Sequence, residues 1–243
     1  MLIPICSTSI FDREILKQIT FEIKSCESVA LLGTTGSGKS SLAQLMARFY
    51  DPSSGDLLLD GVSLKDWDIK HVRKALAYVP QDVFLFSTTI AENISFGQDG
   101  MSTEQIMQAA KMADVYENIM EFPGQFETIL GERGVTLSGG QKQRVSIARA
   151  LAKNPSMLIL DDCLSAVDTH TEHKILNNLK KIMVGKTSLI ISHRVSSAKL
   201  ANRIMVLQDG QIVETGNHAQ LMKRKGYYYE LYQNQLNEEE NGL

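Results

Sequence analysis

The sequence predicts an α/β fold with a mostly parallel central sheet, an N-terminal antiparallel β subdomain and an inserted α-helical subdomain. Two observations favour this class. Short apolar runs alternate with helix-like segments, which is the pattern of strands buried in a parallel sheet. One of these runs, 28–32, leads directly into a glycine-rich loop, and a helical segment at 41–50 follows that loop.

The other elements follow from apolar spacing and turn signals. Short strands are expected at 57–59, 75–79, 157–160 and 187–191, and a hairpin at 203–213 around Asp209-Gly210. Helical spacing covers about 103–121, and a helix from Ser138 to Lys153 ends at Asn154-Pro155. We expect a single domain, 1–243, with a core at about 1–81 and 135–232, a helical subdomain at about 82–134 and a polar, frayed tail at 233–243.

A phosphate-binding loop is the most specific local motif. Its glycines let the backbone turn sharply and point N–H groups inward, towards the start of the following helix. Lys39 is expected to neutralise phosphate charge, and the Ser40 hydroxyl to bind Mg²⁺. A flexible glycine turn is the alternative, which the full pattern between a strand and a helix disfavours. The expected nucleotide-binding residues of this P-loop NTPase core are Gly33, Thr34, Thr35, Gly36, Ser37, Gly38, Lys39, Ser40 and Ser41.

Two adjacent carboxylates follow the apolar run at 157–160. Asp161 and Asp162 therefore emerge at the carboxyl edge of the predicted sheet, where parallel sheets bind ligands. Asp161 fits the Mg²⁺ ligand of a P-loop enzyme, and Asp162 is placed to polarise the attacking water. A helix N-cap pair is the alternative reading for either residue alone.

Composition restricts the function classes. The chain has 243 residues, a hydrophobic content of 43% and a formal net charge of −3, so it lacks the basic excess that would indicate nucleic acid as a partner. Three cysteines at unrelated spacings fit a reducing cytosol, and Cys163 is expected to be a small buried hydrophobe. No apolar run approaches the roughly 20 residues of a membrane span, and residues 1–11 lack the pattern of a signal peptide.

Together, the motifs resemble the nucleotide-binding domain of an ATP-binding cassette transporter over about residues 15–230. Six motifs stand in the family order, which makes the likeness highly specific. They are the P-loop; Gln81 of the Q-loop; the signature Leu137, Ser138, Gly139, Gly140 and Gln141; the Walker B residues Leu160, Asp161 and Asp162; the D-loop at 165–168 with Asp168; and the switch histidine His193. For His193 taken alone, a capped core histidine is the alternative.

The resemblance implies that two such domains dimerise head to tail, with each ATP held between one chain's P-loop and the other chain's signature. The signature lies at a helix start, which is a second anion site with a positive dipole end. Mg²⁺ would be held by Ser40, Gln81 and Asp161. The implied catalytic residues are Asp162, His193, Gln81 and Lys39, with His193 holding the γ-phosphate and the attacking water.

Two segments resemble exporters in particular. Residues 131–134 resemble the exporter X-loop, and residues 84–86 with the segment after them resemble the pattern near the coupling helices. The apolar triplet is either subdomain core or an exposed patch suited to a membrane domain. The expected partners are a second nucleotide-binding domain and transmembrane domains, at the cytoplasmic side of the cell membrane. Membrane segments of a longer chain could precede Met1.

The chain departs from the family pattern at Asp162, where glutamate is usual. The shorter side chain withdraws the carboxylate by about 1.5 Å, and misplacements near 1 Å can cost roughly 10²-fold in rate. We therefore expect slow hydrolysis at this P-loop and a heterodimer whose partner supplies the active Walker B residue; a homodimer remains open. Phe11 is the candidate for stacking on adenine, or is merely a core residue.

Three functions remain open. The first is an ATPase domain that drives an exporter, and the second is an ATP-dependent dimerisation module with little turnover of its own. The third is a soluble cassette protein of DNA repair or translation, which the exporter-like segments and the lack of a basic excess disfavour.

Overall fold

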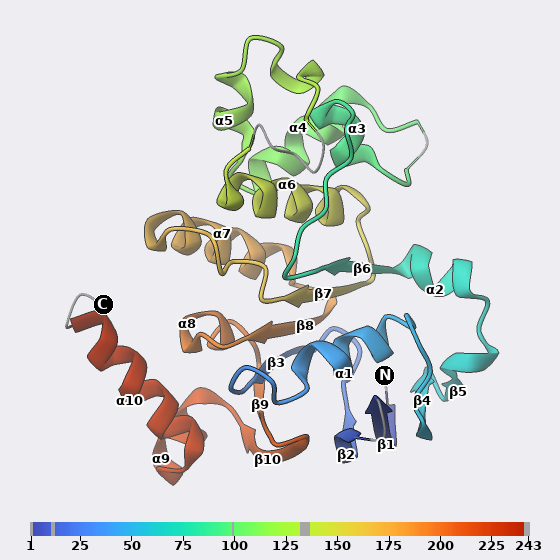
Figure 1. The fold of residues 1–243 in the computed structure, drawn as a ribbon, viewed down its shortest axis with the longest axis vertical. Coiled ribbons are helices and arrows are strands. Elements are labelled where there is room, and N and C mark those ends of the chain that lie inside the picture. Colours follow the sequence, from blue (N-terminus) through green and yellow to red (C-terminus); the bar gives the residue numbers. More distant parts are fainter. Residues whose placement is uncertain (1, 11–12, 99, 132–136, 241–243) are drawn as a thin grey trace. The chain divides into compact units, whose positions relative to one another are not determined.

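The computed structural model describes residues 2–10, 13–98, 100–131 and 137–240, which divide into two units (Figure 1). The first unit contains Met1–Leu76 and Gly185–Leu243, and the second contains Ala77–Val184. Both units combine strands with helices, as the predicted α/β class requires. Within the described ranges, no helix combines the length and the apolar character needed to cross a membrane.

An antiparallel sheet lies in the first unit. Its strand order is β2 (Arg13–Glu22), β1 (Leu2–Ile10), β4 (Ser54–Leu59) and β5 (Val62–Ser63), and each neighbouring pair is antiparallel. This sheet confirms the predicted N-terminal β subdomain. β4 begins at Ser54 rather than at residue 57 because Ser54 and Gly55 already pair with β1.

The parallel strands of the first unit surround β3 (Ser28–Leu32). This strand lies between β8 (Thr187–Ser192) and β9 (Arg203–Gln208) and is parallel to both. All of its residues are buried, as expected for a central strand covered on both faces. The predicted hairpin at Asp209-Gly210 joins β9 to β10 (Gln211–Gly216), and both turn residues have the positive φ that a type I′ turn requires.

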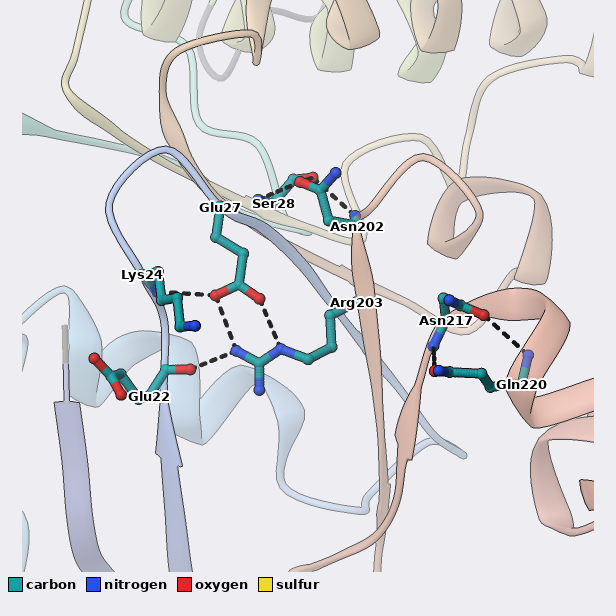
Figure 2. A network of polar contacts seen from close by, with 8 residues as sticks. All are labelled: Glu22, Lys24, Glu27, Ser28, Asn202, Arg203, Asn217 and Gln220. Atoms are coloured by element: carbon teal, nitrogen blue, oxygen red, sulfur yellow. Dashed lines mark hydrogen bonds and ion pairs between the residues drawn. The ribbon is translucent and has the colours of Figure 1, made fainter.

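An ion pair fixes the start of β3 beside β9, as Figure 2 shows. The Arg203 Nε and Nη2 atoms donate to the Glu27 carboxylate at 2.7 and 3.0 Å, and Nη2 also donates to the Glu22 carbonyl. Burial opposes ionisation of Glu27, but the Arg203 guanidinium and the Lys24 amide hold its pKa below the usual value. Alongside, Asn202 Oδ1 accepts from Ser28 N at 3.0 Å. These contacts anchor the end of β3 that is opposite the phosphate loop.

The first unit's helices differ from the predicted bounds where the backbone is left-handed. α1 (Lys39–Met46) begins two residues early because Gly38, with φ of 103°, ends the loop. It ends at Met46 because Arg48, with φ of 53°, leaves the helical conformation. The other helices of this unit are η1 (Leu64–Asp66), α2 (Ile69–Ala75), α8 (Val195–Ala198), α9 (His218–Arg224) and α10 (Tyr227–Glu240).

The expectation of a frayed tail from residue 233 was wrong for the residues described. α10 continues as a helix to Glu240. Its first turn is held by the Glu214 carboxylate of β10, which accepts from the backbone N–H groups of Tyr227 and Tyr228 at 2.7 and 3.2 Å. A carboxylate at a helix N-terminus stabilises the helix because it accepts hydrogen bonds from the free N–H groups of the first turn. Its negative charge also interacts favourably with the positive end of the helix dipole.

The second unit is organised around α6 (Gly139–Ala152), which matches the predicted helix at 138–153. Helices α3 (Ile90–Ser95) and α4 (Thr103–Met112) pack against it, and Figure 1 shows it between these helices and α7 (Thr169–Ile182). The predicted helical segment at 103–121 is divided into α4 and α5 (Tyr116–Met120), since Asp114 is left-handed with φ of 55°. The remaining elements are β6 (Leu76–Val79), β7 (Met157–Asp161) and η2 (Gln125–Glu127).

The subdomain boundaries proposed at residues 82 and 134 remain a prediction. The second unit begins near β6 and also includes β7, α6 and α7, so it extends well beyond that segment on the C-terminal side. What the unit does show is that α3 and α4, which lie within 82–134, pack on α6, the helix that begins with the signature.

Candidate functional site

The phosphate loop joins β3 to α1 in the first unit. Gly36 and Gly38 have φ of 82° and 103°, a conformation that side chains other than glycine's rarely adopt. The residue at the N-cap of α1 is Gly38, which has no side chain to accept hydrogen bonds from the first turn, and that turn contains no acidic residue. The loop therefore leads into a helix N-terminus that carries positive potential and no side-chain cap from its own sequence.

Gly33 is required by the close packing of the loop against β9. A Cβ atom built there would lie 2.2 Å from the Leu207 carbonyl oxygen and 2.9 Å from Ser37 Oγ. The nearer neighbour is backbone of a buried strand, so it has little freedom to move away. The first glycine of the motif is therefore needed for the fold of the loop, before any ligand is considered.

We expect Gly33→Ala to destabilise the protein by about 1–3 kcal/mol, the usual cost of overpacking a close-packed site. Thermal and denaturant unfolding measure this effect. Gly139→Ala is the matched control, because a Cβ there meets its nearest neighbour, Ala166 Cβ, at an ordinary 3.5 Å and alanine is the better helix former. Equal stabilities for the two variants would show that the loop relaxes away from β9.

Lys39 lies against the loop that precedes it. Its Nζ donates hydrogen bonds to the carbonyl oxygens of Gly33 and Thr34, both at 2.8 Å, and its side chain is largely buried. Ser37 Oγ is also buried, and no described residue forms a hydrogen bond with it. A cation and a buried hydroxyl that no described residue contacts by a hydrogen bond thus lie within one short loop of mostly glycine and hydroxyl residues.

His193 follows β8 in the same unit and is exposed, so the alternative of a core histidine does not hold. Its backbone is held on both sides. Ser192 Oγ accepts from Arg194 N at 2.9 Å, and Gln235 of α10 donates to the His193 carbonyl oxygen at 2.6 Å. The contact to Gln235 had no signal in the sequence, because the two residues are far apart in the chain.

The acidic pair lies in the second unit, at the end of β7. Asp161 is buried, and Tyr78 of β6 donates its hydroxyl to Asp161 Oδ2 at 2.7 Å. Asp162 is partly exposed and left-handed, with φ of 45°. The next described helix, α7, has Asp168 as its N-cap, so neither Asp161 nor Asp162 caps it. The alternative of an N-cap pair is therefore wrong.

Cys163 behaves as the sequence predicted. It is buried beside the acidic pair, and burial together with the charges of Asp162 and Asp161 raises the pKa of its thiol to about 12. A thiol with so high a pKa carries almost no thiolate at neutral pH and is inert as a nucleophile.

The signature residues form the start of α6. Ser138 is the N-cap: its Oγ accepts from Gln141 N at 3.3 Å, and Gln141 Oε1 accepts from Ser138 N at 3.0 Å. This reciprocal pair is a capping box, which the S-x-x-Q spacing encodes. Leu137 precedes it and is buried, so it anchors the helix start in the second unit.

The D-loop turn packs directly on this helix. Gln143 Nε2 donates to Ser165 Oγ and Gln143 Oε1 accepts from Ala166 N, both at 3.0 Å. A Cβ atom at Gly140 would lie 3.0 Å from the Ala166 carbonyl oxygen. Asp168 then caps α7 by accepting from Thr171 N at 3.0 Å, and that hydrogen bond lowers the pKa of its carboxyl. The structure thus brings the signature and the D-loop together, through a glutamine that sequence reasoning missed.

Gln81 is exposed just after β6, and the apolar triplet follows it. The triplet, residues 84–86, was expected to be either subdomain core or an exposed patch, and each expectation holds in part. Leu85 is fully buried, whereas Phe84 is 53% exposed. Phe86 stacks on Phe96, with ring centroids 4.3 Å apart, and Phe96 is also exposed. The triplet therefore contributes both to the core of the unit and to an aromatic surface.

Arg149, near the end of α6, binds this aromatic segment. It donates to the carbonyl oxygens of Asn93 and Phe84 at 2.7 and 3.1 Å and to Asn93 Oδ1 at 2.9 Å. Its guanidinium also lies 5.6 Å from the ring centroid of Phe86. Burial lowers its pKa to about 10, so it stays charged at neutral pH. One helix therefore carries the signature at its start and holds the aromatic segment near its end.

Two predicted features fall on residues that the structure does not describe. Phe11, the candidate for adenine stacking, lies outside the described residues, and so do residues 132–134 of the X-loop-like segment. The other predicted site residues are described: the P-loop and His193 in the first unit, and Gln81, Asp161, Asp162, the signature and Asp168 in the second.

Known proteins provide an independent comparison. A family model described as ABC transporter matches residues 16–165. The chain is 44% identical over 228 residues to the uncharacterized ABC transporter ATP-binding protein YfiB of Bacillus subtilis (strain 168), covering 94% of this chain and 39% of that protein. It is 43% identical over 222 residues to ATP-binding cassette sub-family B member 5 of Homo sapiens, covering 91% of this chain and 18% of that protein.

Among solved structures, a bacterial Atm1-family ABC exporter with ATP bound matches with a TM-score of 0.94 and 41% sequence identity. The match covers 97% of this chain and 42% of that chain. The chain thus spans less than half the length of each of these proteins.

Proposed function

Because the chain belongs to the ABC transporter family, we propose that it is the ATP-binding and ATP-hydrolysing domain of an exporter. In this proposal it dimerises head to tail with a second such domain when ATP binds, and it drives transport by membrane domains from the cytoplasmic side of the membrane. The observation that carries the proposal is the phosphate loop, where Lys39 and the start of α1 concentrate positive potential.

The loop fits a polyphosphate chemically. Backbone N–H groups at the start of α1 would bind phosphate oxygens, and Lys39 would move its donors from the Gly33 and Thr34 carbonyls to the phosphates. A phosphate oxygen would also supply the partner that Ser37 Oγ lacks among the described residues. Thr34, Thr35, Ser40 and Ser41 complete the proposed cradle, with Phe11 stacking on adenine.

The residues proposed for Mg²⁺ offer the hard oxygen atoms that this ion prefers: the Ser40 hydroxyl, the Gln81 amide oxygen and the Asp161 carboxylate. Mg²⁺ would neutralise charge on the β- and γ-phosphates. Tyr78 prepares Asp161 for this role, because its hydroxyl donates to Asp161 Oδ2 at 2.7 Å and so restricts the orientation of the carboxylate.

We therefore expect Tyr78→Phe to weaken the apparent affinity for Mg²⁺ about tenfold, the lower end of the effect of removing a hydrogen-bond partner of a metal ligand. Titration of Mg²⁺ in a nucleotide-binding assay measures it. Tyr116→Phe is the matched control, since that ring packs on Phe126 at 6.0 Å, in the helical part of the unit. Equal Mg²⁺ affinities in both variants would contradict a role for Tyr78 at the metal.

His193 and Asp162 have the proposed roles of contacting the γ-phosphate and polarising the attacking water. The exposure of His193 at the end of β8 supports this, because its side chain is accessible to a ligand. The aspartate at 162 supports slow hydrolysis at this P-loop, since its carboxylate is one methylene shorter than the usual glutamate. The fast site of the proposed dimer would then combine the signature of this chain with the P-loop of a partner chain that has a different sequence.

The aromatic surface around Phe84, Phe86 and Phe96 is the proposed contact for a membrane domain. Two of these rings are more than half exposed, and Arg149 holds the segment on α6. A contiguous exposed apolar patch often marks an interaction site.

A second candidate function is an ATP-dependent clamp with little turnover of its own, which the aspartate at 162 favours. The two candidates separate in one experiment: ATP hydrolysis is measured on the natural full-length protein alone and together with candidate cassette partners. Hydrolysis that appears only with a second cassette chain supports the asymmetric exporter domain. ATP binding without hydrolysis in every combination would reject it in favour of the clamp.

A further inference from the structure

The loop that contains His193 is held by a side chain from α10. Gln235 Nε2 donates to the His193 carbonyl oxygen at 2.6 Å, and Gln235 Oε1 accepts from Val195 N at 2.8 Å. One amide group therefore bridges the backbone on both sides of Arg194. A terminal amide that donates to one backbone group and accepts from another fixes its own orientation as well as theirs.

The second of these hydrogen bonds replaces a missing helix cap. α8 begins at Val195, and its N-cap residue, Arg194, makes no capping hydrogen bond with its side chain. The N–H groups in the first turn of a helix have no partner within the helix. Gln235 supplies one from a distant part of the chain, so the start of α8, directly after the histidine, depends on α10.

α10 is itself held firmly enough to act as a support. Tyr228 is fully buried, and its hydroxyl lies 2.7 Å from His218 Nδ1 of α9. One turn later, Lys199 Nζ lies 4.2 Å from the ring centroid of Tyr232. The start of the helix is bound by Glu214, as described above, Figure 1 shows α10 leading away from α9, and α10 also contacts α8. Gln235 thus projects from a helix that is tied to α8, α9 and β10.

We propose that Gln235 is a positioning residue for the switch histidine. It holds the peptide that follows His193 and the N–H at the start of α8, and so sets where the imidazole stands relative to the γ-phosphate. The proposal rests on the proposed role of His193 in hydrolysis. It assigns a part in the chemistry to α10, which contains none of the residues proposed above to contact the nucleotide.

Gln235→Leu and Gln235→Glu separate positioning from stability. Leucine removes both hydrogen bonds, whereas glutamate keeps the acceptor for Val195 N and places a carboxylate oxygen against the His193 carbonyl. We expect both to lower kcat for ATP hydrolysis about tenfold, less than the roughly 10²-fold that a 1 Å misplacement can cost. KM for ATP should stay within about twofold, because no group that binds ATP is removed. The assay uses the natural full-length protein with its partner chain, in an Asp162→Glu background.

Gln233→Leu is the control. Gln233 lies two residues earlier on α10, on a different face of the helix, and should keep the parent kcat. Hydrogen exchange at the Val195 amide reports the hydrogen bond from Val195 N to Gln235 without any enzymatic readout. The exchange should accelerate in Gln235→Leu and not in Gln233→Leu.

A double-mutant cycle with His193→Ala decides the mechanism. If Gln235 acts through the histidine, Gln235→Leu adds no further loss once His193→Ala is present. An equal loss in both backgrounds, or an unchanged kcat in Gln235→Leu, would overturn the proposal. If His193→Ala itself left hydrolysis unchanged, the proposed function of the histidine would fail, which is a distinct result from a failure of Gln235 alone.

Discussion

Replacing Asp162 with glutamate is expected to raise the rate of ATP hydrolysis at this chain's own P-loop by up to about 10²-fold, because the carboxylate advances by one methylene towards the attacking water. The position has room for the change, since Asp162 is partly exposed at the end of β7. Asp161, the buried neighbour, stays fixed by Tyr78 and should not move. Single-turnover hydrolysis with a candidate partner chain present would separate the two sites of the proposed dimer.

The same change has a small expected cost in stability. Asp162 has φ of 45°, a left-handed conformation that aspartate in general tolerates better than glutamate, because a short polar side chain can form hydrogen bonds with the nearby backbone. Rates should therefore be compared per folded molecule, with thermal unfolding measured in parallel. Asp162→Asn is the control, since it keeps the shape of aspartate and removes the charge. A Glu variant that is no faster than the parent would refute the idea of a weakened base.

The second large effect is expected at the signature. Gly140→Val should reduce steady-state hydrolysis by the proposed dimer about 10²-fold, an effect comparable to removing an oriented backbone donor from a catalytic site. A Cβ at Gly140 already comes within 3.0 Å of the Ala166 carbonyl, so the branched side chain must displace either the helix start or the D-loop. Both belong to the surface that would meet the partner's ATP. ATP binding to this chain's own P-loop should stay within about twofold.

Lys39→Ala in this chain provides the comparison for Gly140→Val. In an asymmetric dimer, it should abolish ATP binding at the slow site while hydrolysis at the partner's P-loop continues. Steady-state hydrolysis and nucleotide binding per chain, measured for both variants, decide the assignment. If Lys39→Ala stopped all hydrolysis and Gly140→Val did not, the P-loop of this chain would belong to the fast site.

Local sequence was sufficient for several elements because the forces that form them act over a few residues. The capping box of Ser138 and Gln141 follows from a three-residue spacing, and the α6 helix lies within one residue of its predicted ends. The hairpin at Asp209-Gly210 follows from the two residues that most readily adopt positive φ. The boundaries that differed, such as the end of α1, depend on left-handed residues such as Arg48, which propensity does not reveal.

The sequence by itself therefore determined the P-loop, the signature helix, the acidic strand end and the family, since each is a contiguous pattern with its own physical cause. Only the tertiary structure decided which side chains support them: Tyr78 on Asp161, Gln143 on the D-loop, Arg149 on the aromatic segment, and Gln235 on the loop of His193. These partners come from distant segments, and a single hydrogen bond across such a distance leaves no periodicity in the chain. The physical reason is that chain folding, rather than local propensity, brings donor and acceptor together.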